Sequence, residues 1–442
     1  MAPACVVLDR TVAFRDHPAE AEPLGEEAPG VVGGNIAARS RYKYLRAMKP
    51  DLQVVDPPGV SCLTMVRPHI SDPIPQYGRY LDIGFVAAAH ESLVVIHAGS
   101  SYSGWYLVVD LASSSPRSST IPSIAYVDYG SYKPAGFGIV ITALQGGAFI
   151  LAKLLFRFRR PTEGLSSGKL YLWESLRSSW AYKVADLPAQ VCHAWRVHRS
   201  FPVESRNLLC WVDLLHGLLL WDLDEVVQSD VHMSFVPLPR NFCEEYDQQR
   251  LPNQEDFRTM ACVDGNIKFV AMDGFVEGTP ISLVTYTLHL YGPSPSWTKD
   301  AVLRLDDLWA DETYISMGLP RITPLFPILS TQEHDVVYLV IPSDVERVEG
   351  FRVRRVLFLL SVDTRKTMVI SATQQNLPRT LMSSRHLIAF DAASQLGSKY
   401  HQRAVEAIGM GPSGKKIKLM TSATESCEVE ALDDQSPLRC DM

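Results

Sequence analysis

The stretch "LLCWVDLLHGLLLWDLDEV", residues 208–226, decides the fold of this chain. Two apolar runs, LLCWV and LLLW, flank a short connection that contains Asp213, His216 and Gly217. Neither run alternates between apolar and polar residues, which indicates strands that are covered on both faces. Aspartate accepts backbone hydrogen bonds at turns, and glycine adopts conformations that other residues avoid. The stretch therefore predicts a β-hairpin that is buried within a larger β structure.

A catalytic interpretation of the same residues stays open. Asp213 could orient His216 toward a nucleophile, as the acid does in the acid–histidine pairs of hydrolases. A turn, however, recruits aspartate and glycine for purely local reasons, and it needs no further partner. We therefore favour the turn over the catalytic site.

The hairpin pattern recurs along the chain. Related segments, each with an apolar strand, a turn and a second apolar strand, begin at Leu107, Leu170, Leu218, Leu288 and Leu357, 48 to 70 residues apart. In two of them the turn is followed by a tryptophan, Trp180 or Trp297. Propeller blades repeat at about 40 to 50 residues and tolerate insertions in their loops. We expect an all-β fold, a β-propeller-like array of antiparallel hairpins, with the tryptophans in the blade cores.

The bulk composition excludes some classes of protein. The chain has 442 residues and a net charge of −7, which does not favour general nucleic-acid binding. Its eight cysteines are scattered without a CxxC pair, so we expect reduced thiols and no zinc finger. The start of the chain does not resemble a signal peptide. These observations predict a protein of the cytoplasm or nucleus.

One segment, "GIVITALQGGAFILAKLLFRFRR" at residues 138–160, is long and apolar enough to suggest a membrane helix. Gln145, Gly146 and Gly147 lie at its centre, where they weaken a helix and suit a hairpin turn. The segment therefore predicts two strands, and we expect no membrane association.

The domain organisation follows from the same patterns. We expect one β domain over residues 1–392, with a flexible insertion at 17–34 that is rich in Ala, Glu, Pro and Gly. Residues 393–442 lose the strand pattern and predict a mostly disordered tail. The best candidate for a helix is "SSRHLIAFDAASQ" at 383–395.

Several motifs together carry a family resemblance. The stretch "WVDLLHGLLLWD" is followed by "MSFVPLP" at 233–239 and "FRTMACVDGNIKFV" at 257–270, and it is preceded by "CVVLDR" at 5–10 and "VVDPPGVS" at 54–61. This combination resembles the plant domain of unknown function 1618 family, which is expanded in grasses. The motif residues we single out are Trp211, Asp213, Gly217, Asp222, Pro237, Pro239, Asp264 and Gly265.

The resemblance covers roughly residues 5–390, and the named domain roughly 208–341. It implies a plant protein with no established activity. The repeats also resemble F-box-associated and kelch-like propellers, but no F-box segment precedes the first strands.

We expect a non-enzymatic protein-interaction module whose partner and oligomeric state the sequence does not define. We assign no catalytic residue, cofactor or metal ligand, and no cluster of acids or cysteines accompanies the pair His193 and His198. One alternative is a hydrolase-type enzyme that uses carboxylates lining a central channel, namely Asp110, Asp213, Asp222 and Asp273. Another is a nuclear regulatory protein that gathers Arg157, Arg159, Arg160, Arg352, Arg354 and Arg355 on one face to contact nucleic acid.

Overall fold

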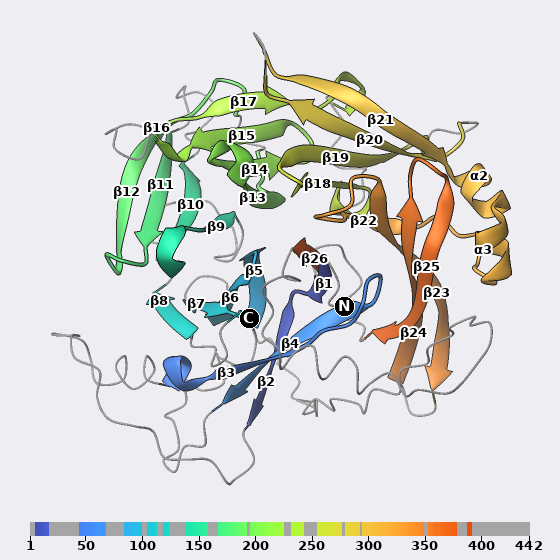
Figure 1. Cartoon of the computed structure of the whole chain (residues 1–442), viewed down its shortest axis with the longest axis horizontal. Coiled ribbons are helices and arrows are strands. Elements are labelled where there is room, and N and C mark those ends of the chain that lie inside the picture. The colour runs from blue at the N-terminus through green and yellow to red at the C-terminus, as the bar shows by residue number, and fades with distance from the viewer. Residues whose placement is uncertain are drawn as a thin grey trace, which may run out of the picture.

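Six groups of strands, which we call blades, form a ring around a common centre, and most neighbouring strands within them pair antiparallel (Figure 1). The computed structural model describes residues 5–16, 44–67, 84–99, 104–112, 118–122, 138–157, 167–191, 195–224, 231–242, 254–275, 279–291, 294–348, 352–377 and 387–390. The remainder of the chain, including the predicted insertion at 17–34 and the predicted tail at 393–442, lies outside the described residues. The all-β fold is confirmed.

Among the described residues, five blades each use four strands in chain order, and only β16, which lies between β15 and β17 along the chain, joins another blade. Blade 1 consists of β5 (Gly84–His90), β6 (Leu93–Gly99), β7 (Gly104–Asp110) and β8 (Ser118–Pro122). Blade 2 consists of β9 (Ile139–Ala143), β10 (Phe149–Arg157), β11 (Ser167–Glu174) and β12 (Ser179–Asp186), with the short β16 (Val231–His232) added parallel to β12. Blade 3 consists of β13 (Arg199–Val203), β14 (Leu208–Asp213), β15 (Gly217–Asp222) and β17 (Ser234–Pro237).

Blade 4 consists of β18 (Arg258–Val263), β19 (Asn266–Asp273), β20 (Ser282–His289) and β21 (Ser296–Arg304). Blade 5 consists of β22 (Leu325–Leu329), β23 (Val336–Val348), β24 (Arg352–Asp363) and β25 (Met368–Leu377). Two short helices, α2 (Leu305–Ala310) and α3 (Glu312–Ser316), lie outside the ring (Figure 1). The described residues also form the single-turn 3-10 helices η3 (Gln145–Gly147), η4 (Glu204–Arg206), η6 (Arg240–Phe242) and η7 (Gln254–Asp256).

Blade 6 closes the ring with strands from both ends of the described chain. Its order is β26 (Leu387–Phe390), β1 (Val6–Asp9), β4 (Val60–Arg67) and β3 (Lys49–Gln53), and β1 pairs antiparallel with β26. The strand β2 (Thr11–Asp16) pairs with both β4 and β5, so it joins blade 6 to blade 1. The predicted helix at 383–395 was therefore wrong over residues 387–390, because pairing with β1 gives this apolar segment a buried place in the sheet.

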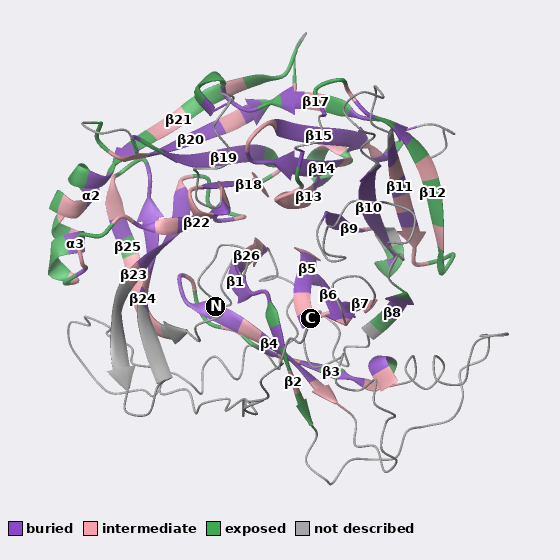
Figure 2. Cartoon of the chain, turned by 180° about the vertical axis from the view of Figure 1, so that it is seen from behind, coloured by how far each residue is buried: buried purple, intermediate pink, exposed green. Residues whose placement is uncertain are grey.

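The innermost strands form a closed ring. Going around it, β5, β9, β13, β18, β22 and β26 each contact the next, and β26 contacts β5 again. Six large apolar clusters of described residues fill the spaces between neighbouring blades. Between blades 3 and 4, for example, Val212 and Leu218 share a cluster with Phe269 and Tyr286. The strands β14 and β15, which contain the runs around residue 210, are thus covered on both faces by the neighbouring blades, which explains why these runs lack polar alternation (Figure 2).

The repeat found in the sequence corresponds to the blades. Leu107, Leu170, Leu218, Leu288 and Leu357 all lie on the third strand of their blades, in β7, β11, β15, β20 and β24. Trp180 and Trp297 lie on the fourth strands of blades 2 and 4, in β12 and β21. Each indole donates a hydrogen bond of 2.8 Å to a proline carbonyl on the fourth strand of the preceding blade, Trp180 to Pro122 and Trp297 to Pro237. The repeated tryptophan is therefore a contact between blades.

We expect Trp297→Phe to lower the free energy of unfolding by about 1 kcal/mol, because phenylalanine keeps most of the apolar contact and loses only the bond to Pro237. Trp180→Phe should cost a similar amount by losing the bond to Pro122. The two sites lie between different pairs of blades, so the effects should add in the double variant. Urea denaturation of the three variants measures this. A cost near zero for both would show that the indole N–H groups do not stabilise the ring.

The segment 138–160 contains two strands, as predicted. Within it β9 and β10 pair antiparallel around the turn at Gln145–Gly147. Among the described residues, no helix is long and apolar enough to cross a membrane. Within the described ranges, the thiols of Cys210 and Cys262 are free.

Candidate functional site

Turns that follow four of the inner strands lie together on one face of the ring, which we call the turn face. Three contacts connect these turns in order: His90 Nε2 lies 3.1 Å from Glu204 Oε1, Ser205 Oγ donates to Gly265 O at 2.8 Å, and Asp264 N donates to Thr331 O at 3.2 Å. The turns after β5, β13, β18 and β22 thereby surround the centre of the ring on this face.

Each of these four turns carries a carboxylate, namely Glu91, Glu204, Asp264 and Glu333. We call these four residues the acidic set. Over the part of the chain that the structure describes, none of them lies within 4.0 Å of a lysine or arginine nitrogen. The side chains of Glu204 and Asp264 are 52% and 72% exposed. The centre of the turn face is therefore negatively charged and accessible to a ligand.

Two histidines accompany the acidic set. His334 Nε2 lies 3.0 Å from Asp264 Oδ2, and His90 forms the equivalent pair with Glu204. The hydrogen bond from His90 holds the pKa of the Glu204 carboxyl below its usual value, against the smaller opposing effect of burial. Glu204 is therefore ionised at neutral pH.

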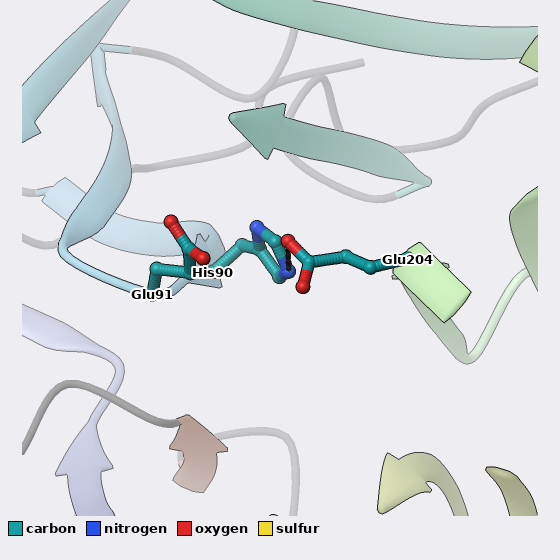
Figure 3. Close-up of side chains that lie close together, drawn as sticks. All are labelled: His90, Glu91 and Glu204. Atoms are coloured by element: carbon teal, nitrogen blue, oxygen red, sulfur yellow. Dashed lines mark ion pairs between the residues drawn. The ribbon is translucent and has the colours of Figure 1, made fainter. Parts of the chain in front are cut away.

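His90, Glu91 and Glu204 form the tightest group of potential ligands on the turn face (Figure 3). Each offers one ligand atom, and the three atoms lie within 4.8 Å of one another. His90 ends β5 and Glu91 begins the next turn, with the left-handed backbone conformation at φ 49°. Glu204 follows β13 directly, in η4. The contact of β5 with β13 brings the three residues together from blades 1 and 3.

Asp213 lies on the opposite face, at the end of β14 where the hairpin of residues 208–222 turns. Its carboxylate is fully buried and accepts hydrogen bonds from the backbone N–H groups of Arg196 at 2.6 Å and Leu215 at 2.8 Å. His216 Nδ1 lies 3.0 Å and His198 Nδ1 3.6 Å from its oxygens.

These contacts determine the charge states around Asp213. Burial alone would raise the pKa of its carboxyl, but the hydrogen bond with His216, the nearby histidine charges and the Arg196 N–H together hold it below its usual value. In return the hydrogen bond with Asp213 raises the pKa of His216. The acid–histidine pair considered for catalysis does exist, but its acid accepts backbone hydrogen bonds that hold the turn together.

The other three acids proposed for a catalytic channel also cap turns. Asp110 accepts hydrogen bonds from Ser92 Oγ and Ala112 N, Asp222 from Asp224 N, and Asp273 from Gly274 N. Asp213 and Asp222 lie at opposite ends of one hairpin, while Asp110 and Asp273 belong to blades 1 and 4. The structure does not bring these four acids together.

The other motif residues lie mainly in contacts within and between blades. The Trp211 indole donates to Gly138 O at 2.9 Å, joining blade 3 to blade 2. A Cβ at Gly217 would overlap with the carbonyl oxygen of Val236 on the adjacent strand. Pro237 O accepts the hydrogen bond of Trp297 as described above, and Pro239 O accepts one from Phe242 N at 2.8 Å.

Asp264 and Gly265 differ from these residues, because they form the β18–β19 turn on the turn face and both have positive φ, 45° and 73°. The sequence did not reveal His90, Glu91, Glu204 or Glu333 as candidates. Their only common signal is that each lies at or just after the end of an innermost strand, which is recognisable once the blades are known. The structure does not describe the side chains of the six arginines considered for nucleic-acid contact.

The closed ring of six blades and its acidic set define an all-β, propeller-like protein with a charged face. Residues 211–338, from the second strand of blade 3 to the second strand of blade 5, match the family described as "Protein of unknown function (DUF1618)". This match confirms the family resemblance over that segment.

No curated protein matches the chain. Among solved structures it is similar to dihydro-heme d1 dehydrogenase NirN in complex with DHE, at 11% identity and a TM-score of 0.26, with 69% of this chain and 67% of that chain covered. A TM-score this low carries no information about function.

Proposed function

We propose that this chain is a non-enzymatic interaction module that binds a lysine- and arginine-rich segment of a partner protein on its turn face. The observation that carries the proposal is the acidic set, with one carboxylate on each of four turns and none within ion-pair distance of a described lysine or arginine. A basic segment that lies across the ring centre reaches several of these carboxylates at once. Ion pairs and electrostatic steering would then favour it over neutral or acidic segments.

The charge of this face also argues against the alternatives. A nucleic acid presents phosphates, which the acidic set repels. The acids considered for hydrolysis cap turns, and they do not converge on a common point. The family resemblance supports a plant origin, and the scattered cysteines without a CxxC pair support the cytoplasm or nucleus as the compartment.

Binding of a labelled lysine- and arginine-rich peptide, followed by fluorescence anisotropy, tests the proposal. We expect saturable binding that weakens as salt is raised from about 0.05 M to about 0.5 M. The double variant Asp264→Asn with Glu333→Gln should bind about tenfold more weakly, because two exposed ion pairs are lost. Asparagine tolerates the left-handed backbone at position 264, so the turn should be retained.

The matched control is Asp306→Asn with Glu312→Gln, which removes the same charge from exposed positions on α2 and α3 outside the ring. It should bind the peptide within twofold of the unmodified chain. Equal weakening by both double variants, or no saturable binding to the unmodified chain, would contradict the proposal. A pull-down with the same variants then identifies partners, as proteins retained by the control and lost by the turn-face variant.

A further inference from the structure

The group formed by His90, Glu91 and Glu204 differs from the rest of the turn face in its chemistry. It combines one imidazole with two carboxylates, whereas the His334 and Asp264 pair has no third ligand within the same reach among the described residues. The ring brings the group together from two blades that are not adjacent in sequence, through the contact of β5 with β13.

The two ring nitrogens of His90 have different surroundings. His90 Nδ1 is enclosed and has no hydrogen-bond partner among the described residues, while Nε2 lies 3.1 Å from Glu204 Oε1. A cation held between the imidazole and the carboxylates would bind Nε2, the nitrogen that faces Glu204, and would neutralise two adjacent carboxylates.

The spacing of the three side chains suits a metal ion after a small adjustment. Ligand atoms bound at about 2.0 to 2.2 Å from one ion lie about 3 Å apart, somewhat closer than the present limit of 4.8 Å. The side chain of Glu204 is half exposed, so its carboxylate can move this distance without disturbing the core. Imidazole with carboxylates favours zinc, cobalt, manganese or iron(II) over magnesium or calcium, which prefer oxygen ligands alone.

We propose that His90, Glu91 and Glu204 bind one divalent transition-metal ion of the zinc or cobalt type on the turn face. Three protein ligands leave at least one coordination position open for water or for a side chain of a bound partner. The proposed site uses Glu91 and Glu204, two of the four carboxylates of the acidic set, but it does not depend on the binding of a basic segment. The two can fail separately, because metal binding is measured without any peptide.

Calorimetric titration of the metal-stripped full-length chain with zinc, and visible absorption on titration with cobalt, test this site. We expect one equivalent to bind, with magnesium at least about 100-fold weaker. His90→Ala should weaken zinc and cobalt binding by about 100-fold or more, and Glu204→Gln by about tenfold or more. Glu204 is half exposed and its replacement is isosteric, so this second variant keeps the test meaningful if His90→Ala does not fold.

The matched control is His334→Ala, which removes the other histidine that pairs with a carboxylate on this face. It should bind both metals within twofold of the unmodified chain, with one equivalent still bound. Absence of a one-equivalent site in the unmodified chain would overturn the proposal. Equal weakening of metal binding by His334→Ala and His90→Ala would also overturn the proposal. That result would show that binding does not depend on the group of His90, Glu91 and Glu204.

Discussion

Replacing Asp213 with asparagine is expected to destabilise the folded chain by about 3 kcal/mol, because a fully buried carboxylate loses its charge and part of its hydrogen bonding. The carboxylate accepts two backbone N–H groups, from Arg196 and Leu215, and lies within 3.6 Å of two histidines. Asparagine supplies only one acceptor oxygen, and its NH₂ group would face a donor. Urea denaturation near neutral pH measures the loss.

The pH dependence makes this prediction specific. The folded pKa of Asp213 lies below the ordinary 3.8, so its contribution is present above about pH 4 and is lost as the pH falls further. The folded pKa of His216 lies above the ordinary 6.5, so its contribution is present below that value and is lost as the pH rises through the folded pKa. The difference between the variant and the unmodified chain should therefore be largest between about pH 4 and about pH 6.5.

Asp222→Asn is the matched control, because it changes the same residue type at the other end of the same hairpin. Asp222 is partly exposed and caps a turn through a single backbone N–H, that of Asp224. Its replacement should cost no more than about 1 kcal/mol. If both variants cost the same, or if the pKa of His216 measured by NMR is unchanged in Asp213→Asn, the buried network does not stabilise the hairpin as described.

The sequence predicted those parts of the fold that depend on interactions between residues close together along the chain. Asp213 and Gly217 predicted the hairpin because turn capping and close backbone approach involve neighbouring residues. The periodic leucines predicted the blades because each blade must bury both faces of its strands. Strand β26 was missed because its only reason to be a strand is its pairing with β1, at the other end of the chain. A propensity for one helical turn cannot compete with that pairing.

The candidate site could not be predicted in the same way. His90 and Glu204 meet only when blades 1 and 3 pack in the ring, and no fixed spacing in the sequence reports such a contact. Sequence motifs for metal sites rely on ligands that lie close together along one element. In the same way, the four residues of the acidic set are ordinary turn acids until the ring places their turns around one centre.

The buried lysine Lys153 is a further feature that the sequence did not reveal. Its replacement is expected to have the second large effect on stability. Lys153 lies on β10 in "FILAKLLF", fully buried between blades 1 and 2, with Nζ donating to the Tyr106 hydroxyl at 3.0 Å. Burial lowers its pKa from 10.5 to about 7. Lys153→Met should therefore stabilise the chain near neutral pH by about 3 kcal/mol, since the cost of burying the charge, at most about 5 kcal/mol, exceeds the loss of one hydrogen bond.

The sign of the pH dependence tests whether the buried charge of Lys153 causes the predicted gain in stability. Between about pH 7 and 10.5 the unfolded chain holds a proton that folded Lys153 has released, so the stability of the unmodified chain rises with pH across this window. Below pH 7 both states are protonated, and the full cost of the buried charge remains. The gain from Lys153→Met should thus be largest at or below pH 7 and should shrink as the pH approaches 10.5.

His97 provides a second readout of the same change. Burial first, and then the charge of Lys153, lower its pKa to about 4, so Lys153→Met should raise the pKa of His97 as measured by NMR. Lys169→Met on the neighbouring strand β11 is the control, because Lys169 is only half-buried and its ammonium lies over the Tyr182 ring at 4.7 Å. That change should shift stability by less than about 1 kcal/mol without the alkaline trend. A destabilised Lys153→Met chain, or a gain that does not decline with rising pH, would show that the hydrogen bond to Tyr106 outweighs the buried charge.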